Sequence, residues 1–328
     1  EMSEPLLVDA LAVQRELLGN DHPDVGRTLF TMGWMFFWQG DLTRSLDSFE
    51  EAARVFEKTA SPTDQLPLTA RTAAAFLMSL VGDLEGSRVA LDKALEASEA
   101  AFGPNSVAVA DVHFFSGNLH FDSGQIEEAG RDWERAVAIR RVVYGPEHQQ
   151  YAFAISNFAR YFRVTGQLEE SKRMLDSAIE IFERTYGPDH PALAHTLAAQ
   201  GMTLRSLEDY EGAIHHFERA AAILKELFGP DHSNLSWITR GLAGVYLRMG
   251  DLAEAAAIAR ESLRISEAAY GKGHIDCARS HSLIGYVEYK LGRHPESRQS
   301  YETSLAIRQE VLPVNHRGFI TVYYNLAC

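Results

Sequence analysis

The stretch YGPDHP, Tyr186–Pro191, places a glycine–proline turn directly before an aspartate and a histidine. Related stretches begin at residues 18, 102, 144, 228 and 270, as LGNDHP, FGPNSV, YGPEHQ, FGPDHS and YGKGHI. Their glycines are separated by multiples of 42 residues, without a single insertion or deletion. A motif that recurs at a constant period predicts an array of structural repeats, because copies of one catalytic centre would not be spaced along a single edge.

Each 42-residue unit predicts two helices. A second glycine marker follows the first in each unit, and Glu208 is its one exception. The markers isolate two segments of about 15 to 18 residues whose apolar residues are spaced by three and four, as in amphipathic helices. Small residues recur in one column, as at Gly33, Ala75 and Gly117, where helices approach closely. Around Thr59–Leu68 the glycine is lost and Pro67 appears, so we expect a shifted helix start there.

These columns resemble the tetratricopeptide repeat, and the 42-residue length together with GPDHP is similar to the kinesin light chain type. The resemblance covers essentially the whole chain. It implies an all-α fold, a right-handed α-solenoid (superhelix) of about seven 42-residue helix-turn-helix units plus a half-repeat at each end. We therefore expect a single superhelical domain over residues 1–328. Its repeat loops would lie near residues 19, 61, 103, 145, 187, 229, 271 and 313. Since neither end of the chain resembles a polar cap, we expect a fragment of a longer protein.

Composition restricts the function further. The 328 residues carry a net charge of −14 and contain two cysteines. Clustered Lys and Arg are needed to bind phosphate backbones, so the charge argues against nucleic acid or an anionic membrane as the partner. No apolar run approaches the roughly 18 residues of a membrane span. We expect a cytoplasmic protein without a cofactor, and no catalytic motif predicts an enzyme.

The histidines of the chain raise the question of a metal site. The residue before the motif histidine is mostly Asp, Asn or Glu, and we expect it to cap the following helix. His274, Cys277 and His281 lie at i, i+3 and i+7, so one helix face could present them to a metal. Cys277 and His281 share columns with apolar residues, however, and inward packing is the preferred interpretation. For His113 and His120, the expectation is a buried polar pair with local partners.

The first helix of each pair lines the concave surface in the repeats that the chain resembles, which implies five groove positions per repeat. These positions hold eight of the 31 basic residues and only two of the 45 acidic ones. They begin at Arg27, Phe30, Trp34, Phe37 and Trp38 and recur every 42 residues. The predicted peptide-binding residues are Phe30, Trp34, Trp38, Phe114, Asn118, Arg160, Arg163, Arg205, Trp237, Arg240, Arg248, Arg279, Tyr286, Tyr289 and Lys290.

The sequence thus predicts a non-enzymatic interaction scaffold that binds an acidic/aromatic peptide or partner segment in this groove. The acidic part of the ligand would meet Arg160 to Lys290, and its apolar or aromatic part would meet the aromatic residues of the first repeats. Arg forks hold carboxylates, and aromatic residues anchor interfaces. The resemblance agrees, because kinesin-light-chain-like repeats bind acidic peptides that carry a tryptophan. One alternative is a sensor or regulatory arm of a larger signalling protein that contains a kinase, a protease-like domain or a transcription regulator. Another is self-association through open solenoid ends. Inert surface charge is the remaining interpretation of the groove.

Overall fold

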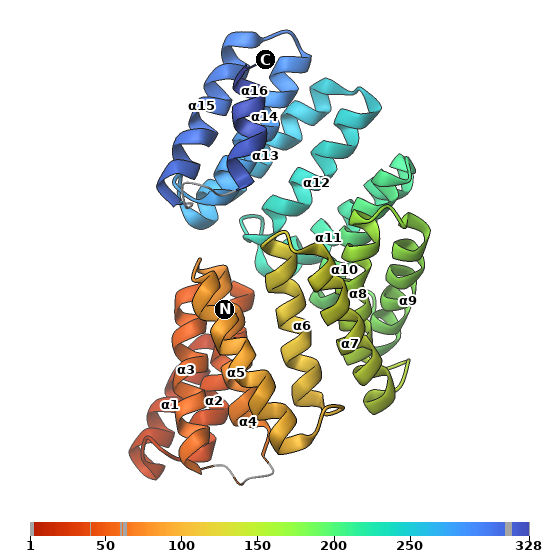
Figure 1. Cartoon of the computed structure of the whole chain (residues 1–328). Helices are drawn as coiled ribbons and strands as arrows, with labels where there is room; N and C mark the ends of the chain where they lie inside the picture. The colour runs from red at the N-terminus through yellow and green to blue at the C-terminus, as the bar shows by residue number, and fades with distance from the viewer. Residues whose placement is uncertain (1–2, 40, 60, 62–63, 312–316, 328) are drawn as a thin grey trace. The chain divides into compact units, whose positions relative to one another are not determined.

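The computed structural model describes residues 3–39, 41–59, 61, 64–311 and 317–327, and every regular element there is a helix. This confirms the all-α class. The chain forms two compact units, residues 1–165 and 166–328. In both units, helices that follow one another in sequence pack side by side (Figure 1). The expectation of one continuous superhelical domain over residues 1–328 stays a prediction.

Unit 1 contains α1 (Ser3–Leu18), α2 (Pro23–Gln39), α3 (Leu42–Thr59), α4 (Leu66–Leu80), α5 (Leu84–Phe102), α6 (Val107–Asp122), α7 (Ile126–Tyr144) and α8 (Gln149–Val164). Unit 2 contains α9 (Leu168–Tyr186), α10 (Pro191–Ser206), α11 (Tyr210–Phe228), α12 (Asn234–Met249), α13 (Leu252–Tyr270), α14 (Ile275–Lys290), α15 (His294–Val311), the 3-10 turn η1 (Arg317–Phe319) and α16 (Ile320–Ala327).

Helix α4 has the shifted start that the sequence predicted. It begins at Leu66, one position later in the 42-residue register than α6 at Val107. Pro67 occupies its first turn, where a missing N–H costs nothing because that group has no partner inside the helix. The residue before the helix, Gln65, makes no capping hydrogen bond through its side chain. The loss of the motif in this loop therefore shortens the helix without displacing the repeat.

Aspartates cap several second helices of the pairs. The carboxylates of Asp83, Asp209 and Asp251 each accept a hydrogen bond from the backbone amide three residues later. Such a cap satisfies one of the N–H groups that the first turn leaves without a partner. The opposite ends of second helices close on the motif glycine, as at Gly187 with φ of +87°. This left-handed conformation favours glycine because a Cβ would crowd the backbone.

The motif aspartate does not cap the first helices, and that prediction was wrong. The residue that caps α10 is His190, whose Nδ1 accepts a hydrogen bond from the Ala192 amide at 3.2 Å. His148 and His274 accept the same bond through Nδ1 from the amides two residues later. The imidazole reaches the amide because its backbone is extended, with φ of −79° and ψ of 138° at His190. The histidine, not the aspartate, is therefore the capping residue of the motif.

The same imidazoles stack on the aromatic ring that ends the preceding helix. Tyr186 and His190 lie with ring centroids 4.1 Å apart and planes 13° from parallel. Tyr270 and His274 repeat the arrangement at 4.0 Å and 21°. Stacking of this kind contributes about 0.5–1.5 kcal/mol beyond burial. The loop between two repeats is thus closed by one ring pair and one capping bond, a combination we call the Tyr–His clasp.

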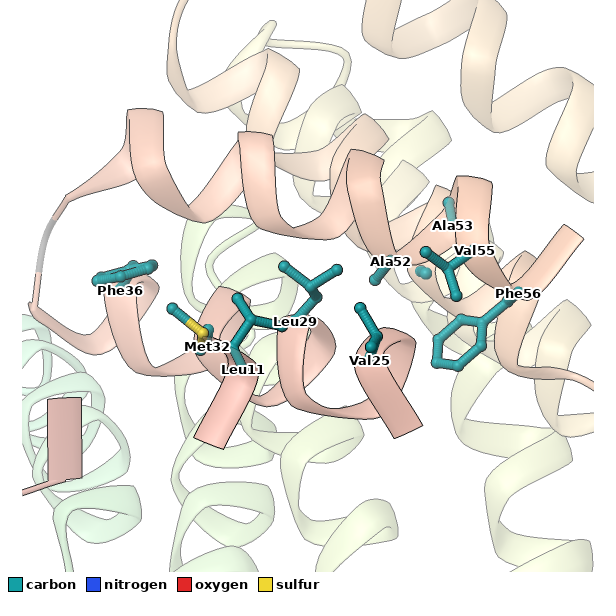
Figure 2. Packing of buried hydrophobic residues seen from close by; sticks show 10 residues of the cluster. Leu11, Val25, Leu29, Met32, Phe36, Ala52, Ala53, Val55 and Phe56 are labelled. Carbon is teal, nitrogen blue, oxygen red and sulfur yellow. The ribbon is translucent and has the colours of Figure 1, made fainter. Parts of the chain in front are cut away.

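The core is built from the apolar stripes of adjacent helices. Figure 2 shows the cluster in which Val25, Leu29 and Phe36 of α2 meet Val55 and Phe56 of α3. Each of these side chains is buried. Because one helix pair cannot cover such a stripe alone, packing against the next pair completes the core.

The small residues of the repeat allow the close approach that the sequence predicted. A Cβ added at Gly117 would lie 2.6 Å from the ring of the fully buried Trp133. Gly33 stands in the same relation to Phe49, and Gly201 to Phe217. First helices also contact the next first helix, as α10 does α12 and α12 does α14. These contacts bring the first helices of unit 2 together along one face.

Candidate functional site

A groove of about 1050 Å³ lies within unit 2, along α10, α12 and α14. Its walls come mostly from the five positions per repeat at which the sequence predicted a groove. Six predicted binding residues line it together, on three successive first helices: Arg205, Trp237, Arg240, Arg248, Tyr286 and Lys290. The other lining residues are Met202, Ser206, Gly241, Gly244, Leu247, Gly250, Leu252 and Leu283.

Three cations of the groove have no acidic partner. Within residues 166–311 and 317–327, no carboxylate lies within 4 Å of the charged groups of Arg205, Arg248 or Lys290. Burial lowers the pKa of Arg205, and the charge of Arg248 lowers it further. The Arg205 guanidinium stays protonated, since arginine does not lose its proton in proteins. The groove therefore holds a positive charge that the described residues do not neutralise.

Arg240 is different, because a carboxylate holds it. Its Nη2 donates to Asp276 at 3.3 Å, and Arg279 donates to the same carboxylate oxygen at 2.9 Å. Burial opposes the charge of Asp276, yet Arg279 and Arg240 keep the pKa of that carboxyl below its usual value. Burial likewise lowers the pKa of Arg240. Arg240 and Arg279 thus form part of a charge network, and Arg279 does not line the groove.

Aromatic and aliphatic side chains form the rest of the wall. Trp237 lies half-buried beside His195, with ring centroids 5.4 Å apart. Tyr286 is 38% exposed, and the ammonium of Lys290 lies over the Tyr286 ring, 5.4 Å from the ring centroid. Such a cation–π pair orients the lysine side chain but does not neutralise its positive charge. Tyr289, also predicted as a groove residue, packs instead near His294 and does not line the groove.

The predicted residues of unit 1 are largely engaged with one another. Phe30 and Trp34 meet edge to face and both pack on Phe49. The guanidinium of Arg140 lies over the Phe114 ring, with its Cζ 4.6 Å from the ring centroid. These rings are half-buried rather than freely exposed. Binding through Phe30, Trp34 and Phe114 stays a prediction. The side chain of Trp38 lies outside the described residues.

The polar predictions of unit 1 also have contacts. Arg160 lies 4.2 Å above the Phe121 ring and 3.5 Å from the Asp122 carboxylate. Burial lowers its pKa, although Asp122 opposes the shift. Arg163 is half-buried. Asn118 is only 7% exposed, and its Oδ1 has no hydrogen-bond partner among the described residues. The two predicted acidic groove positions, Asp111 and Asp122, thus lie in ion pairs, the first of them with Arg140 at 2.8 Å.

The first histidine group has the local partner that the sequence predicted. His113 and His120 of α6 both bind the Asp132 carboxylate of α7, each through Nδ1 at 2.8 Å. Burial opposes the charge of Asp132, but these two hydrogen bonds keep its pKa below the usual value. The expectation of a buried polar pair with local partners is confirmed. Sequence reasoning missed the partner, since Asp132 carries no motif.

In the second group only Cys277 packs fully inward, whereas His274 and His281 are half-buried. Cys277 is completely buried beside Ala278 and Ile307, and its thiol donates to the Gly271 carbonyl at 3.3 Å. His274 uses its Nδ1 as a helix cap. Among the described residues, no group of three or more His, Cys, Asp or Glu side chains is arranged to hold a metal ion.

The sequence matches models of the tetratricopeptide repeat over residues 1–58, 117–150 and 154–310. The chain belongs to the tetratricopeptide repeat family. Members of this family generally serve as protein–protein interaction modules, and their fold is typically non-catalytic. None of the described helices has the length and apolar character that crossing a membrane requires. No curated protein matches the sequence significantly.

Solved structures share the fold at low identity. BtubC (BKLC) from P. vanneervenii is 22% identical, with a TM-score of 0.53 over 70% of this chain and 92% of that one. A Rap protein complexed with competence and sporulation factor is 12% identical, with a TM-score of 0.69 over 88% of this chain and 77% of that one. The apo form of RapI is 14% identical, with a TM-score of 0.61 over 87% and 98%. At such identities the likeness shows the fold alone.

Proposed function

We propose that unit 2 binds an acidic, extended segment of a partner protein in the groove of α10, α12 and α14. The observation that carries the proposal is the charge of this groove. Arg205, Arg248 and Lys290 line it without a neighbouring carboxylate among the described residues. The chain as a whole has a net charge of −14, so the groove is a basic site in an acidic protein. An acidic segment is drawn to it, while the remaining surface repels polyanions.

An aromatic or large apolar side chain would complete the ligand. Trp237, Tyr286, Leu247 and Leu283 offer ring faces and aliphatic surface between the cations. Aromatic and arginine residues contribute most of the energy in protein interfaces. An aromatic residue flanked by Asp or Glu therefore matches both parts of the wall. The Rap complex with competence and sporulation factor supports the proposal, since it is a ligand-bound example of a similar fold.

Calorimetric titration with a tryptophan-bearing acidic dodecapeptide tests the proposal. The Arg205→Glu/Arg248→Glu variant is expected to lose at least about tenfold in affinity, because it replaces two attractive charges with repulsive ones. Arg298→Glu is the matched control, since Arg298 lies on α15, is 76% exposed and does not line the groove. A second peptide with Gln and Asn in place of Glu and Asp isolates the contribution of the ligand's charge. Equal affinities of wild type and double variant for the acidic peptide would contradict the proposal.

Self-association is a second candidate, and exposed apolar side chains on two helices favour it. Helix α1 exposes Leu6 and Leu17, with relative exposures of 67% and 74%. Helix α16 exposes Ile320 and Tyr324, each at 69%. Apolar surface of this kind marks interfaces when it is contiguous. Light scattering at several concentrations checks this, and Leu17→Glu should lower the mean mass if α1 takes part.

A further inference from the structure

Arg205 occupies an unusual position across the backbone of α12. Its Nη1 donates to the Gly241 carbonyl at 3.4 Å. A Cβ added at Gly244 would lie 2.3 Å from the same nitrogen. The missing Cβ of Gly244 therefore leaves a space, which we call the glycine floor, on which the guanidinium can lie, whereas the missing Cβ of Gly241 makes room for the Phe217 ring. Any side chain at position 244 would push the end of Arg205 away.

On the glycine floor, the Arg205 guanidinium lies within electrostatic range of Arg248, and the two charges repel each other. Burial and this repulsion both lower the pKa of Arg205. The neighbouring Arg240 is paired with Asp276 at 3.3 Å, whereas Arg205, Arg248 and Lys290 have no such partner among the residues described in unit 2. Arg205 is half-buried while Arg248 and Lys290 are exposed, so the repulsion on the Arg205 guanidinium is relieved best by an anion that enters the groove. The three cations of this one groove wall therefore offer an anion an unneutralised positive charge.

We propose that Arg205, Arg248 and Lys290 recognise the phosphate monoester of a phosphorylated segment of a partner protein. This rests on the proposed function and names the ligand class of the same groove. A phosphate monoester carries nearly two negative charges at neutral pH and three acceptor oxygens, against one charge and two oxygens for a carboxylate. Arginine forks bind phosphate through two parallel hydrogen bonds, and a lysine adds a point charge. Three unpaired cations match the dianion better than they match a single carboxylate.

The test compares phenyl phosphate with benzoate, which share an aromatic body and differ in the anionic group. Calorimetry on the full chain at pH 7.5 is expected to give at least about tenfold tighter binding for phenyl phosphate. At pH 5 the advantage should disappear, because the second pKa of a phosphate monoester is near 6. Arg205→Ala and Arg248→Ala should each abolish most of the advantage. Arg298→Ala, on the exposed face of α15, should leave it unchanged.

Gly244→Ala provides a positioning test that keeps every charge. Because the atom in its way is the end of a flexible side chain, the variant should fold normally and shift only the Arg205 guanidinium. We expect it to weaken phenyl phosphate about tenfold while hardly changing benzoate. Circular dichroism melting verifies its fold, and Arg248→Ala tests the same site through loss of a charge without altering the glycine floor.

The two ligands distinguish phosphate recognition from the binding of acidic peptides in the same groove. Equal binding of phenyl phosphate and benzoate would overturn the phosphate assignment and leave an acidic-peptide groove intact. Unchanged phenyl phosphate binding in Arg205→Ala and Arg248→Ala would overturn it too, by locating the anion elsewhere. The acidic dodecapeptide is titrated in parallel. If it fails to bind while phenyl phosphate keeps its advantage, the acidic-peptide function falls and the phosphate site stands.

Discussion

Replacing His190 by alanine removes both halves of one Tyr–His clasp. The variant loses the bond from the Ala192 amide to the imidazole Nδ1, and it loses the ring stacked 4.1 Å from Tyr186. A helix cap contributes about 1 kcal/mol. A stacked aromatic pair contributes about 0.5–1.5 kcal/mol. Together they predict a loss of about 2 kcal/mol in the free energy of unfolding at pH 8.

The loss depends on pH because the cap needs a neutral imidazole. Burial lowers the pKa of His190 below its ordinary value of 6.5. A lowered pKa means that the stabilisation is complete above pH 6.5 and is lost as the pH falls through the lower value of the folded protein. The difference between wild type and His190→Ala should therefore shrink between pH 8 and pH 5.

Urea denaturation at both pH values measures this difference, and hydrogen exchange at the Ala192 amide reports the capping bond itself. His190→Asn is the matched control, since asparagine is a good helix cap but has no ring to stack. We expect it to lose only the stacking contribution, about 1 kcal/mol. An alanine variant as stable as the wild type at pH 8 would refute the clasp. An equal loss at pH 8 and pH 5 would refute the role of the neutral imidazole.

Two further predictions concern stability. Glu208 has φ of +65°, a conformation that costs a residue with a Cβ about 1–2 kcal/mol. Glu208→Gly should therefore stabilise unit 2 by about 0.5–1 kcal/mol in urea denaturation after the entropy of glycine is subtracted. Glu208→Ala keeps the Cβ, so a gain of the same size there would contradict this reason. Asp132→Ala leaves His113 and His120 without their acceptor and should cost about 2–3 kcal/mol at pH 7. Since the pKa of Asp132 is lowered from 3.8, this cost should shrink as the pH falls below 3.8, and a cost that persists there would show that the carboxylate charge is not its cause.

The fold was predictable because its signals are local and repeated. The 42-residue period, the amphipathic spacing and columns such as Gly33, Ala75 and Gly117 determine the helix pairs and their close packing. Even the exception in the Thr59–Leu68 loop predicted the late start of α4. What periodicity does not give is the partner of a residue outside the motif, which is why Asp132 was missed.

The capping residue was assigned wrongly because helix-cap preferences favour aspartate over histidine. The sequence did contain the missing signal. An aromatic residue precedes the histidine by four positions in Tyr144, Tyr186, Phe228 and Tyr270, and each of these rings stacks on the histidine that follows it. At His148, His190 and His274 the stacked imidazole also accepts a hydrogen bond through Nδ1 from the second amide of the helix.

The groove was predicted in part. Counting five positions per repeat found Arg205, Trp237 and Arg248, because first helices of successive repeats contact one another. The same count treated Arg160 as equivalent to these residues, although Asp122 on the preceding first helix lies 3.5 Å from it. An ion pair between two repeats depends on the conformations of the two side chains, and the 42-residue register gives no information about them. The glycine floor under Arg205 was missed because the sequence analysis counted charged and aromatic side chains at the groove positions, and Gly244 has no side chain.

The Tyr–His clasp also constrains how this gene can change in length. Both contacts depend on a fixed separation, four residues from ring to ring and two from imidazole to amide. One codon inserted between Tyr186 and His190 would break the stack, and one inserted after His190 would break the cap. Surface loops usually tolerate insertions and deletions. A loop closed by the Tyr–His clasp would instead lose stability when a single residue is inserted or deleted. That intolerance favours a constant length in the loops that carry the clasp, and it predicts that length variation there occurs as gain or loss of entire 42-residue blocks.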